Sequence, residues 1–154
     1  MRTHLPTLQG NLVALALLRA TCSSEAAPPT SDYPLPTQRD RVGTYPALSK
    51  SGGGYFYDEV LKYRVWVDSE EESDNFHAFP TYEDARAFSL RTDGAEDPLV
   101  LIRQREWIDE PEPDHFIPKK GERITEWKVE WLAGSLREPS SIQDFLASPR
   151  EQKR

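Results

Sequence analysis

The fold is decided by one alternating stretch, Leu61-Lys62-Tyr63-Arg64-Val65-Trp66-Val67. Its odd-numbered residues are apolar and fall on one face of an extended strand, while its even-numbered residues fall on the other face. Comparable short runs occur at 76–79, 99–108 and 125–131. Alternation of this kind is typical of antiparallel strands with one buried and one solvated face. The sequence therefore predicts about four strands in a mostly antiparallel sheet.

A single main helix is predicted over about 81–91. Thr81 can cap its first turn, and Asp84 stands at the third helical position as in a capping box. Gly94 follows the helix and can take the left-handed conformation of a C-terminal cap. The apolar stripe of this helix is Tyr82, Ala85 and Phe88. One helix against one face of a sheet gives a two-layer α+β arrangement.

We therefore expect a small two-layer α+β domain over residues 45–134. Thirteen of the sixteen aromatic residues, including all four tryptophans, lie between Tyr55 and Trp131. Residues 135–154 are expected to form a tail with a short C-terminal helix over Ile142 to Leu146. A domain of this size builds a deep, water-free catalytic pocket less easily than a larger one, which favours binding over catalysis.

Residues 1–44 are expected to be a flexible or mis-assigned extension. Residues 23–46 are rich in Ser, Ala, Pro and Thr, and their prolines are incompatible with a helix interior or a central strand. A bacterial gene can also start at a GTG codon, which otherwise encodes valine. Translation that begins at Val42 is therefore an alternative start of the chain.

The composition indicates which class of partner and which cellular compartment to expect. The chain of 154 residues has 26 Asp+Glu against 19 Lys+Arg and a formal net charge of −7, whereas nucleic-acid binding depends on clustered Lys and Arg. Cys22 is the single cysteine, so an intrachain disulfide is ruled out and a reducing cytoplasm is expected.

The apolar run 12–18 is far shorter than the roughly 20 residues that span a membrane. It faintly resembles a signal peptide, which leaves an exported lipoprotein anchored at Cys22 as an alternative.

The even-numbered face of the deciding stretch is the first candidate site. Trp66 shares that face with Lys62 and Arg64, and an exposed indole between basic groups is typical of a protein-contact hot spot. The alternative is that Trp66 packs beneath another part of the chain.

The second candidate site is the run Asp109-Glu110-Pro111-Glu112-Pro113-Asp114-His115. Its prolines favour an extended and exposed loop. Glu110, Glu112 and His115 could contact a partner protein there, or the run could be a solvated loop. A metal site, or general acid–base chemistry by Glu112 and His115, are further alternatives, but exposed carboxylates keep their ordinary pKa values.

The sequence does not match the nucleotide-binding or hydrolase motifs that we compared with it. Gly52-Gly53-Gly54 is preceded by a loop and followed by a strand, whereas a dinucleotide-binding turn lies between a strand and a helix. We interpret this run as a turn or a strand lead-in. His77 stands between aromatic residues and is interpreted as a packed or edge residue. The sequence has neither a Gly-Lys-Ser/Thr phosphate loop nor a Gly-x-Ser-x-Gly elbow.

Several motifs resemble a small family of uncharacterised bacterial proteins often labelled GNAT-type N-acetyltransferases. They are the run 45–60 (YPALSKSGGGYFYDEV), Tyr63-Arg64-Val65-Trp66, Thr81-Tyr82-Glu83-Asp84-Ala85, Ile108-Asp109-Glu110-Pro111-Glu112-Pro113 and Arg123-Ile124-Thr125-Glu126-Trp127. The resemblance covers about 45–146 and implies acyl transfer from acetyl-CoA. The nearest match to a GNAT pyrophosphate loop is Arg91-Thr92-Asp93-Gly94-Ala95-Glu96, which has Glu96 where that motif has a small residue. The resemblance carries over no catalytic residue.

The leading expectation is a non-catalytic, cytoplasmic protein-interaction module. Its partner would be another protein, with no nucleic acid, membrane, metal or cofactor involved. The first alternative is a GNAT-related N-acetyltransferase, for which acetyl-CoA would be the cofactor. The second alternative is the exported lipoprotein anchored at Cys22.

Overall fold

One mixed sheet organises the protein. The computed structural model describes residues 31–45, 50–51, 53–68 and 75–148, and the sheet order is β1-β5-β4-β2-β3. The four longer strands pair antiparallel, and β1 pairs parallel with β5. The strands are β1 (Lys50–Ser51), β2 (Glu59–Trp66), β3 (Phe76–Phe79), β4 (Leu99–Glu112) and β5 (His115–Lys128). The helices are η1 (Arg39–Thr44), α1 (Tyr82–Arg91), η2 (Val129–Leu132) and α2 (Ser141–Ala147), where η marks a 3₁₀ helix.

The predicted α+β class is confirmed, as are the main helix and the short C-terminal helix. The Thr81 side chain accepts a hydrogen bond from the Asp84 amide at 3.1 Å and so caps α1. Gly94 has a φ of 75°, but it lies two residues beyond the C-cap Thr92. A Cβ on Gly94 would come within 2.9 Å of the Asp68 carbonyl oxygen, so glycine is required by close packing as well as by φ.

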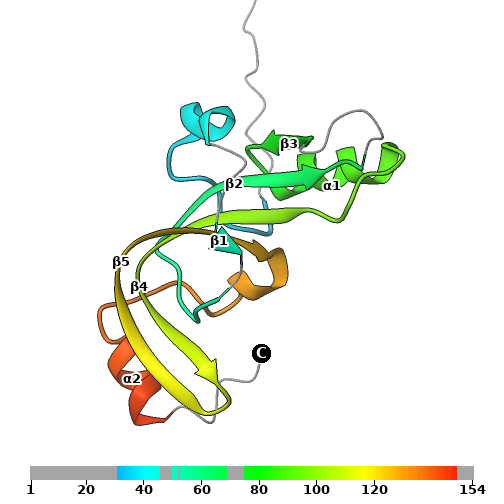
Figure 1. Ribbon diagram of the computed structural model, residues 1–154. Coiled ribbons are helices and arrows are strands. Elements are labelled where there is room, and N and C mark those ends of the chain that lie inside the picture. The colour runs from blue at the N-terminus through cyan, green and yellow to red at the C-terminus, as the bar shows by residue number, and fades with distance from the viewer. Residues whose placement is uncertain (1–30, 46–49, 52, 69–74, 149–154) are drawn as a thin grey trace, which may run out of the picture.

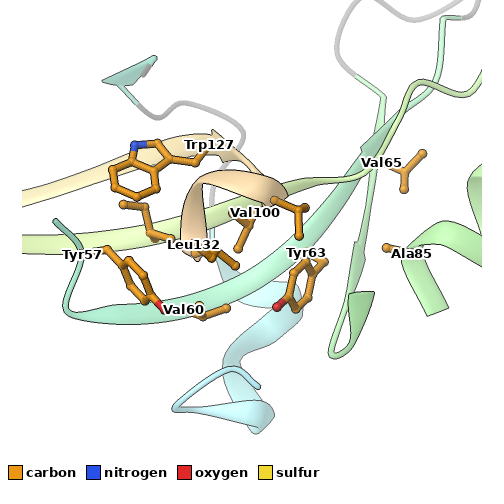
Figure 2. Packing of buried hydrophobic residues seen from close by; sticks show 10 residues of the cluster. Tyr57, Val60, Tyr63, Val65, Ala85, Val100, Trp127 and Leu132 are labelled. Atoms are coloured by element: carbon orange, nitrogen blue, oxygen red, sulfur yellow. The ribbon is translucent and has the colours of Figure 1, made fainter. Parts of the chain in front are cut away.

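The main core lies on the face of the sheet that α1 covers. Side chains from β2, β4 and β5 meet Ala85 of α1 and two residues of η2 there. Figure 2 shows Trp127 and Tyr57 at one end of this cluster, and Val65 and Ala85 at the other. Its buried members are Tyr57, Val60, Tyr63, Val65, Ala85, Val100, Ile102, Trp127, Val129 and Leu132. A bulge between Val60 and Lys62 places Leu61 on the opposite face.

The opposite face is covered too, which corrects two expectations. We call residues 31–45 the strap. Its first part lies on the α1 face, where Tyr33 packs against the main core. Its second part, η1 with Tyr45, packs against the opposite face of β2 and against β3, and Val42 and Tyr45 are buried there. The strap amide of Thr37 donates to the Val60 carbonyl at 3.1 Å. The expectation of a flexible segment is therefore wrong for 31–45, because its prolines are compatible with an extended strap. The expectation of one solvated face is wrong for β2, whose residues from Val60 to Val65 are all buried.

The hairpin of β4 and β5 is longer than predicted, with fourteen residues in each strand. Only 99–103 of β4 pair with β2, so the hairpin continues as a two-stranded ribbon. We call residues 104–112 and 115–123 the distal ribbon. Figure 1 shows it bending away from the rest of the sheet, with α2 beside it and α1 at the other end of the molecule.

The distal ribbon has a small core of its own. Ile142 and Phe145 of α2 pack with Phe56 and Ile108, and Tyr55 and Phe116 border this cluster. The Phe145 ring lies 5.0 Å from the Phe116 ring and 4.7 Å from the Tyr55 ring. Residues 135–148 are therefore part of the packed structure, because the Tyr57 amide donates to the Ser135 carbonyl and the Arg137 amide donates to the Tyr57 carbonyl.

Some expectations concern residues outside the described ranges. These are residues 1–30, with the apolar run 12–18 and Cys22, and also residues 46–49, Gly52, residues 69–74 and residues 149–154.

Candidate functional site

The predicted contact patch of Trp66, Lys62 and Arg64 is not an exposed surface. Lys62 and Arg64 are each 0% exposed, and Trp66 is partly buried. The Phe76 ring of β3 covers both cations, with its centroid 4.3 Å from Lys62 Nζ and 4.7 Å from Arg64 Cζ. The expectation of an exposed basic patch is wrong because β3 and the strap cover this face of β2.

The buried cations are held by polar contacts. Lys62 Nζ donates to the Tyr45 carbonyl at 2.8 Å, which fastens the strap to the sheet. Arg64 and the Trp66 indole both donate to Glu126 Oε1, at 3.3 and 3.1 Å. Burial, together with the neighbouring Arg64 charge, lowers the pKa of Lys62 to about 8, although Glu126 opposes this shift. This cluster is part of the interior and stabilises the packing of the strap.

The second candidate run forms the end of the β4–β5 hairpin and is not a loop, but residues 111–115 are exposed as expected. Glu112 and His115 pair across Pro113 and Asp114, and Asp114 has a φ of 62°, which aspartate tolerates better than most residues. Glu112 and His115 are exposed.

Glu110 has a different role from its neighbours. It accepts hydrogen bonds from the Tyr55 hydroxyl and, at 3.0 Å, from the Asp114 amide. Its carboxylate therefore stabilises the turn and ties it to the cluster beneath α2. The three residues predicted as one contact site divide into one structural residue and two exposed ones.

The glycine run is a close crossing of the chain over the sheet. Gly53 and Gly54 have φ values of 86° and 82°. The Gly53 carbonyl accepts from Gln104 Nε2 at 3.4 Å and from Trp127 Nε1 at 3.3 Å. A Cβ on Gly54 would lie 2.7 Å from Gln104 Nε2 and 2.9 Å from Trp107 Cδ1. Glycine is needed at this position for packing. The run lies between β1 and β2, and β2 begins only at Glu59, so the expectation of a preceding loop and of a strand directly after the run is wrong.

The segment 91–96 follows α1 and turns back towards β2. The Ala95 amide donates to Thr92, and the Glu96 amide donates to the Trp66 carbonyl at 2.8 Å. A GNAT pyrophosphate loop uses amides that point at the ligand from the start of a helix. Two of the amides in this segment are instead engaged within the protein, so its geometry lends no support to acetyl-CoA binding.

The surface that sequence reasoning missed surrounds Trp131. This side chain is 41% exposed although the alternation placed it on the buried face of a strand. The strand ends at Lys128 and the chain turns into η2, so Trp131 points away from the core. Leu136, five residues later, is 56% exposed. The sequence signal for this change of direction was the glycine at position 134. Its φ of 71° shows that the chain turns between Trp131 and Leu136.

The Trp131 ring and the Leu136 backbone are each supported by a buried aromatic residue. The Trp131 ring rests against the buried Trp127 ring, with the centroids 6.2 Å apart and the planes at 71°. Leu136 forms a parallel bridge with Tyr57, and the next residue, Arg137, pairs with the Asp58 carboxylate. The exposed carboxylates of Glu130 and Glu138 flank these residues in sequence. We call Trp131 and Leu136 the Trp131 surface.

The protein is thus a small α+β domain that carries one candidate contact surface, the Trp131 surface. Comparison of the chain with family models, with curated proteins and with solved structures finds no match. Within the described ranges, no cluster of three or more His, Cys, Asp or Glu is placed to hold a metal ion. No helix in this part of the chain is both long enough and apolar enough to cross a membrane.

Proposed function

We propose that this protein is a non-catalytic protein-interaction module that works in the cytoplasm and binds its partner through the Trp131 surface. The observation that carries the proposal is an exposed tryptophan fixed by a buried one. Tryptophan is enriched among the residues that dominate binding energy at protein interfaces. A side chain already held in place loses little conformational entropy on binding, which favours affinity.

The chemistry around the surface indicates the kind of partner. Glu130 and Glu138 are exposed beside Trp131 and Leu136, and the chain as a whole has a net charge of −7. A partner that presents an apolar recess with a basic rim would be complementary to this arrangement. The acidic rim would speed association with such a partner and would make the rate depend on salt.

Strand addition at a sheet edge is less well supported than this side-chain contact. Within the described ranges, the terminal strands β1 and β3 have two and four residues, and Pro80 follows β3 directly. The outer edge of β5 carries Pro118, Lys119 and Lys120 next to a bulge at Gly121. Short edges, proline, lysine and bulges all hinder the addition of another strand.

Comparative affinity capture tests the proposal. Immobilised wild-type chain and the variants Trp131→Ala and Leu90→Ala would be incubated with extract of the cells that make the protein. Leu90 is 75% exposed on α1 and gives a matched control for loss of an exposed apolar side chain. We expect a stoichiometric partner with the wild type and with Leu90→Ala, and a loss of at least tenfold with Trp131→Ala. Equal recovery by all three proteins would contradict the proposed surface.

The acetyltransferase alternative is tested by calorimetric titration of acetyl-CoA into the intact chain. The intact chain is needed because the strap covers β2, which a protein starting at Val42 would expose. We expect the heat to match that of dilution. Saturable binding at micromolar concentration would replace the proposed function with the enzymatic one.

A further inference from the structure

A second interaction surface is occupied by the protein's own strap. The first part of the strap contains Tyr33-Pro34-Leu35-Pro36, in which two residues each precede a proline. Proline fixes its own φ near −65° and moves the residue before it towards extended conformations. Residues 33–36 are therefore predisposed to the polyproline II conformation, which exposes its backbone carbonyl groups.

Aromatic residues of β2 and α1 receive this segment. The Tyr33 ring meets the Tyr82 ring edge-on, with the centroids 4.5 Å apart, and Tyr82 in turn lies 6.1 Å from Tyr63. The Tyr63 hydroxyl donates to the Pro34 carbonyl at 2.6 Å. Pro36 is buried, whereas Leu35 is 40% exposed. We call the surface formed by Tyr63 and Tyr82, with Glu83 at one end and the Val60 carbonyl at the other, the tyrosine groove.

The two ends of the groove bind the strap through polar contacts. At one end the Glu83 carboxylate accepts from the Ser31 hydroxyl at 2.8 and 3.0 Å and from the Asp32 amide at 3.2 Å. At the other end the Val60 carbonyl accepts from the Thr37 amide. Three of the contacts along the groove reach backbone groups of the strap, namely the Asp32 amide, the Pro34 carbonyl and the Thr37 amide. An extended segment of another chain presents the same groups.

The two parts of the strap are anchored at different places. Val42 and Tyr45 are buried on the opposite face of β2, where Lys62 holds the Tyr45 carbonyl. Residues 31–37 therefore have anchors separate from those of 42–45. Recognition of proline-rich segments by aromatic grooves that donate a hydrogen bond to a peptide carbonyl is a recurrent binding mode.

We propose that the tyrosine groove is a binding site for a proline-rich segment of a partner protein with a Tyr-Pro-x-Pro pattern, and that residues 31–37 occupy it in cis. The partner segment competes with the strap. The tethered strap acts at an effective concentration on the order of millimolar, so the intact protein binds such segments weakly until the strap is displaced. This inference concerns a different surface from the Trp131 surface and does not depend on it.

Fluorescence anisotropy with a labelled peptide of the sequence Ser-Asp-Tyr-Pro-Leu-Pro-Thr tests the proposal. The peptide would be titrated with intact wild-type protein and with full-length Tyr33→Ala, whose strap lacks its aromatic anchor. We expect Tyr33→Ala to bind at least about tenfold more tightly than the wild type, because its competitor is weakened. A peptide with both prolines replaced by alanine should bind at least about tenfold more weakly, since it lacks the preformed conformation. Ser31→Ala is a milder variant that should shift affinity in the same direction as Tyr33→Ala.

The contradicting outcomes are equally specific. Equal affinity of the wild type and both strap variants would place the peptide elsewhere and overturn the proposal. Absence of binding to either variant, each shown to be folded by circular dichroism, would overturn it as well. Adding Tyr63→Phe to the Tyr33→Ala protein removes the hydroxyl donor and should weaken binding several-fold. A wild-type dimer in sedimentation that dissociates in Tyr33→Ala would assign the groove to the strap of a second copy, and so reject a partner protein.

Discussion

The two ends of the sheet are stabilised in different ways. At the end that holds β2, both faces are covered: α1, η2 and the first part of the strap lie on one side, and residues 39–45 of the strap lie on the other. The distal ribbon has two strands, and α2 supplies its small core. A two-stranded hairpin is marginally stable alone, so the ribbon depends on α2 and on the segment 55–56 that packs with it. The comparison indicates one cooperative core with an attached ribbon that can open separately.

The largest expected effect separates the two ends directly. Trp127→Ala removes a buried tryptophan from the main core and should cost about 3–5 kcal/mol of global stability. Phe145→Ala removes a ring from the ribbon cluster and should cost a similar amount locally. Hydrogen exchange should then show lost protection over 104–120 in Phe145→Ala, with protection in β2 retained. Equal loss of protection throughout both variants would show that the two ends unfold as one unit.

The next prediction concerns the crossing of the glycine run over the sheet. Gly54→Ala forces a residue with a side chain to a φ of 82° and brings its Cβ against Gln104 and Trp107. The cost should be about 1–3 kcal/mol in urea unfolding. Gly43→Ala is the matched control, because a Cβ there meets nothing within 4 Å, and its effect should stay within about 0.5 kcal/mol. An effect of Gly54→Ala no larger than that of Gly43→Ala would contradict the close approach.

A pH dependence is expected from the buried Lys62. Its pKa is lowered to about 8 in the folded protein, mainly by burial, from an ordinary value near 10.5. Between these two pH values the unfolded chain still binds the proton that the folded protein has released. Stability should therefore rise with pH across this window, by on the order of 1–3 kcal/mol. Below pH 8 both states are protonated and this contribution does not change.

Lys62→Met should remove that rise. The test is urea unfolding of wild type and variant at pH 7, 8, 9 and 10, because their difference cancels the titration of other groups. A parallel pH dependence in the two proteins would mean that Lys62 is not the source.

The smallest expected losses of stability distinguish Glu110 from the exposed residues Glu112 and His115 at the hairpin end. Glu110→Gln weakens two hydrogen bonds to a carboxylate and should cost about 1–2 kcal/mol. Glu112→Gln and His115→Ala change exposed side chains and should stay within about 0.5 kcal/mol. Thermal unfolding of the three variants measures this. If Glu112→Gln lost as much stability as Glu110→Gln, the conclusion that Glu110 anchors the turn would be contradicted.

The sequence predicted the elements whose signals are local. The cap at Thr81 and the stripe on α1 lie within one short segment, and the alternation in 61–67 needs no distant information. Ribbon residues 115–124 were missed because Pro118, Lys119, Lys120 and Gly121 are poor strand formers. They are tolerated in β5 because the outer edge of the ribbon needs neither their amides nor their side chains for packing.

The candidate sites were predicted less well, since burial depends on distant segments. Lys62 and Arg64 alternate like solvated residues, and only the position of the strap and of Phe76 determines that they are buried. Trp131 continues the alternation of β5, but η2 begins at Val129 and turns its side chain outward. In both cases the local pattern is intact, and a segment elsewhere in the chain decides which face is exposed.

Site-specific photo-crosslinking tests the central claim most directly, namely that the Trp131 surface binds a partner protein. Ala133 stands between Trp131 and Leu136 in the sequence and would carry a benzophenone side chain, with Ala87 as the comparison position; both alanines are exposed. Irradiation of cells that carry either variant, followed by detection of higher-mass adducts, compares the Trp131 surface with the exposed face of α1. The account predicts one discrete adduct from position 133 and its absence at position 87. The same adducts from both positions, or none from position 133, would contradict it.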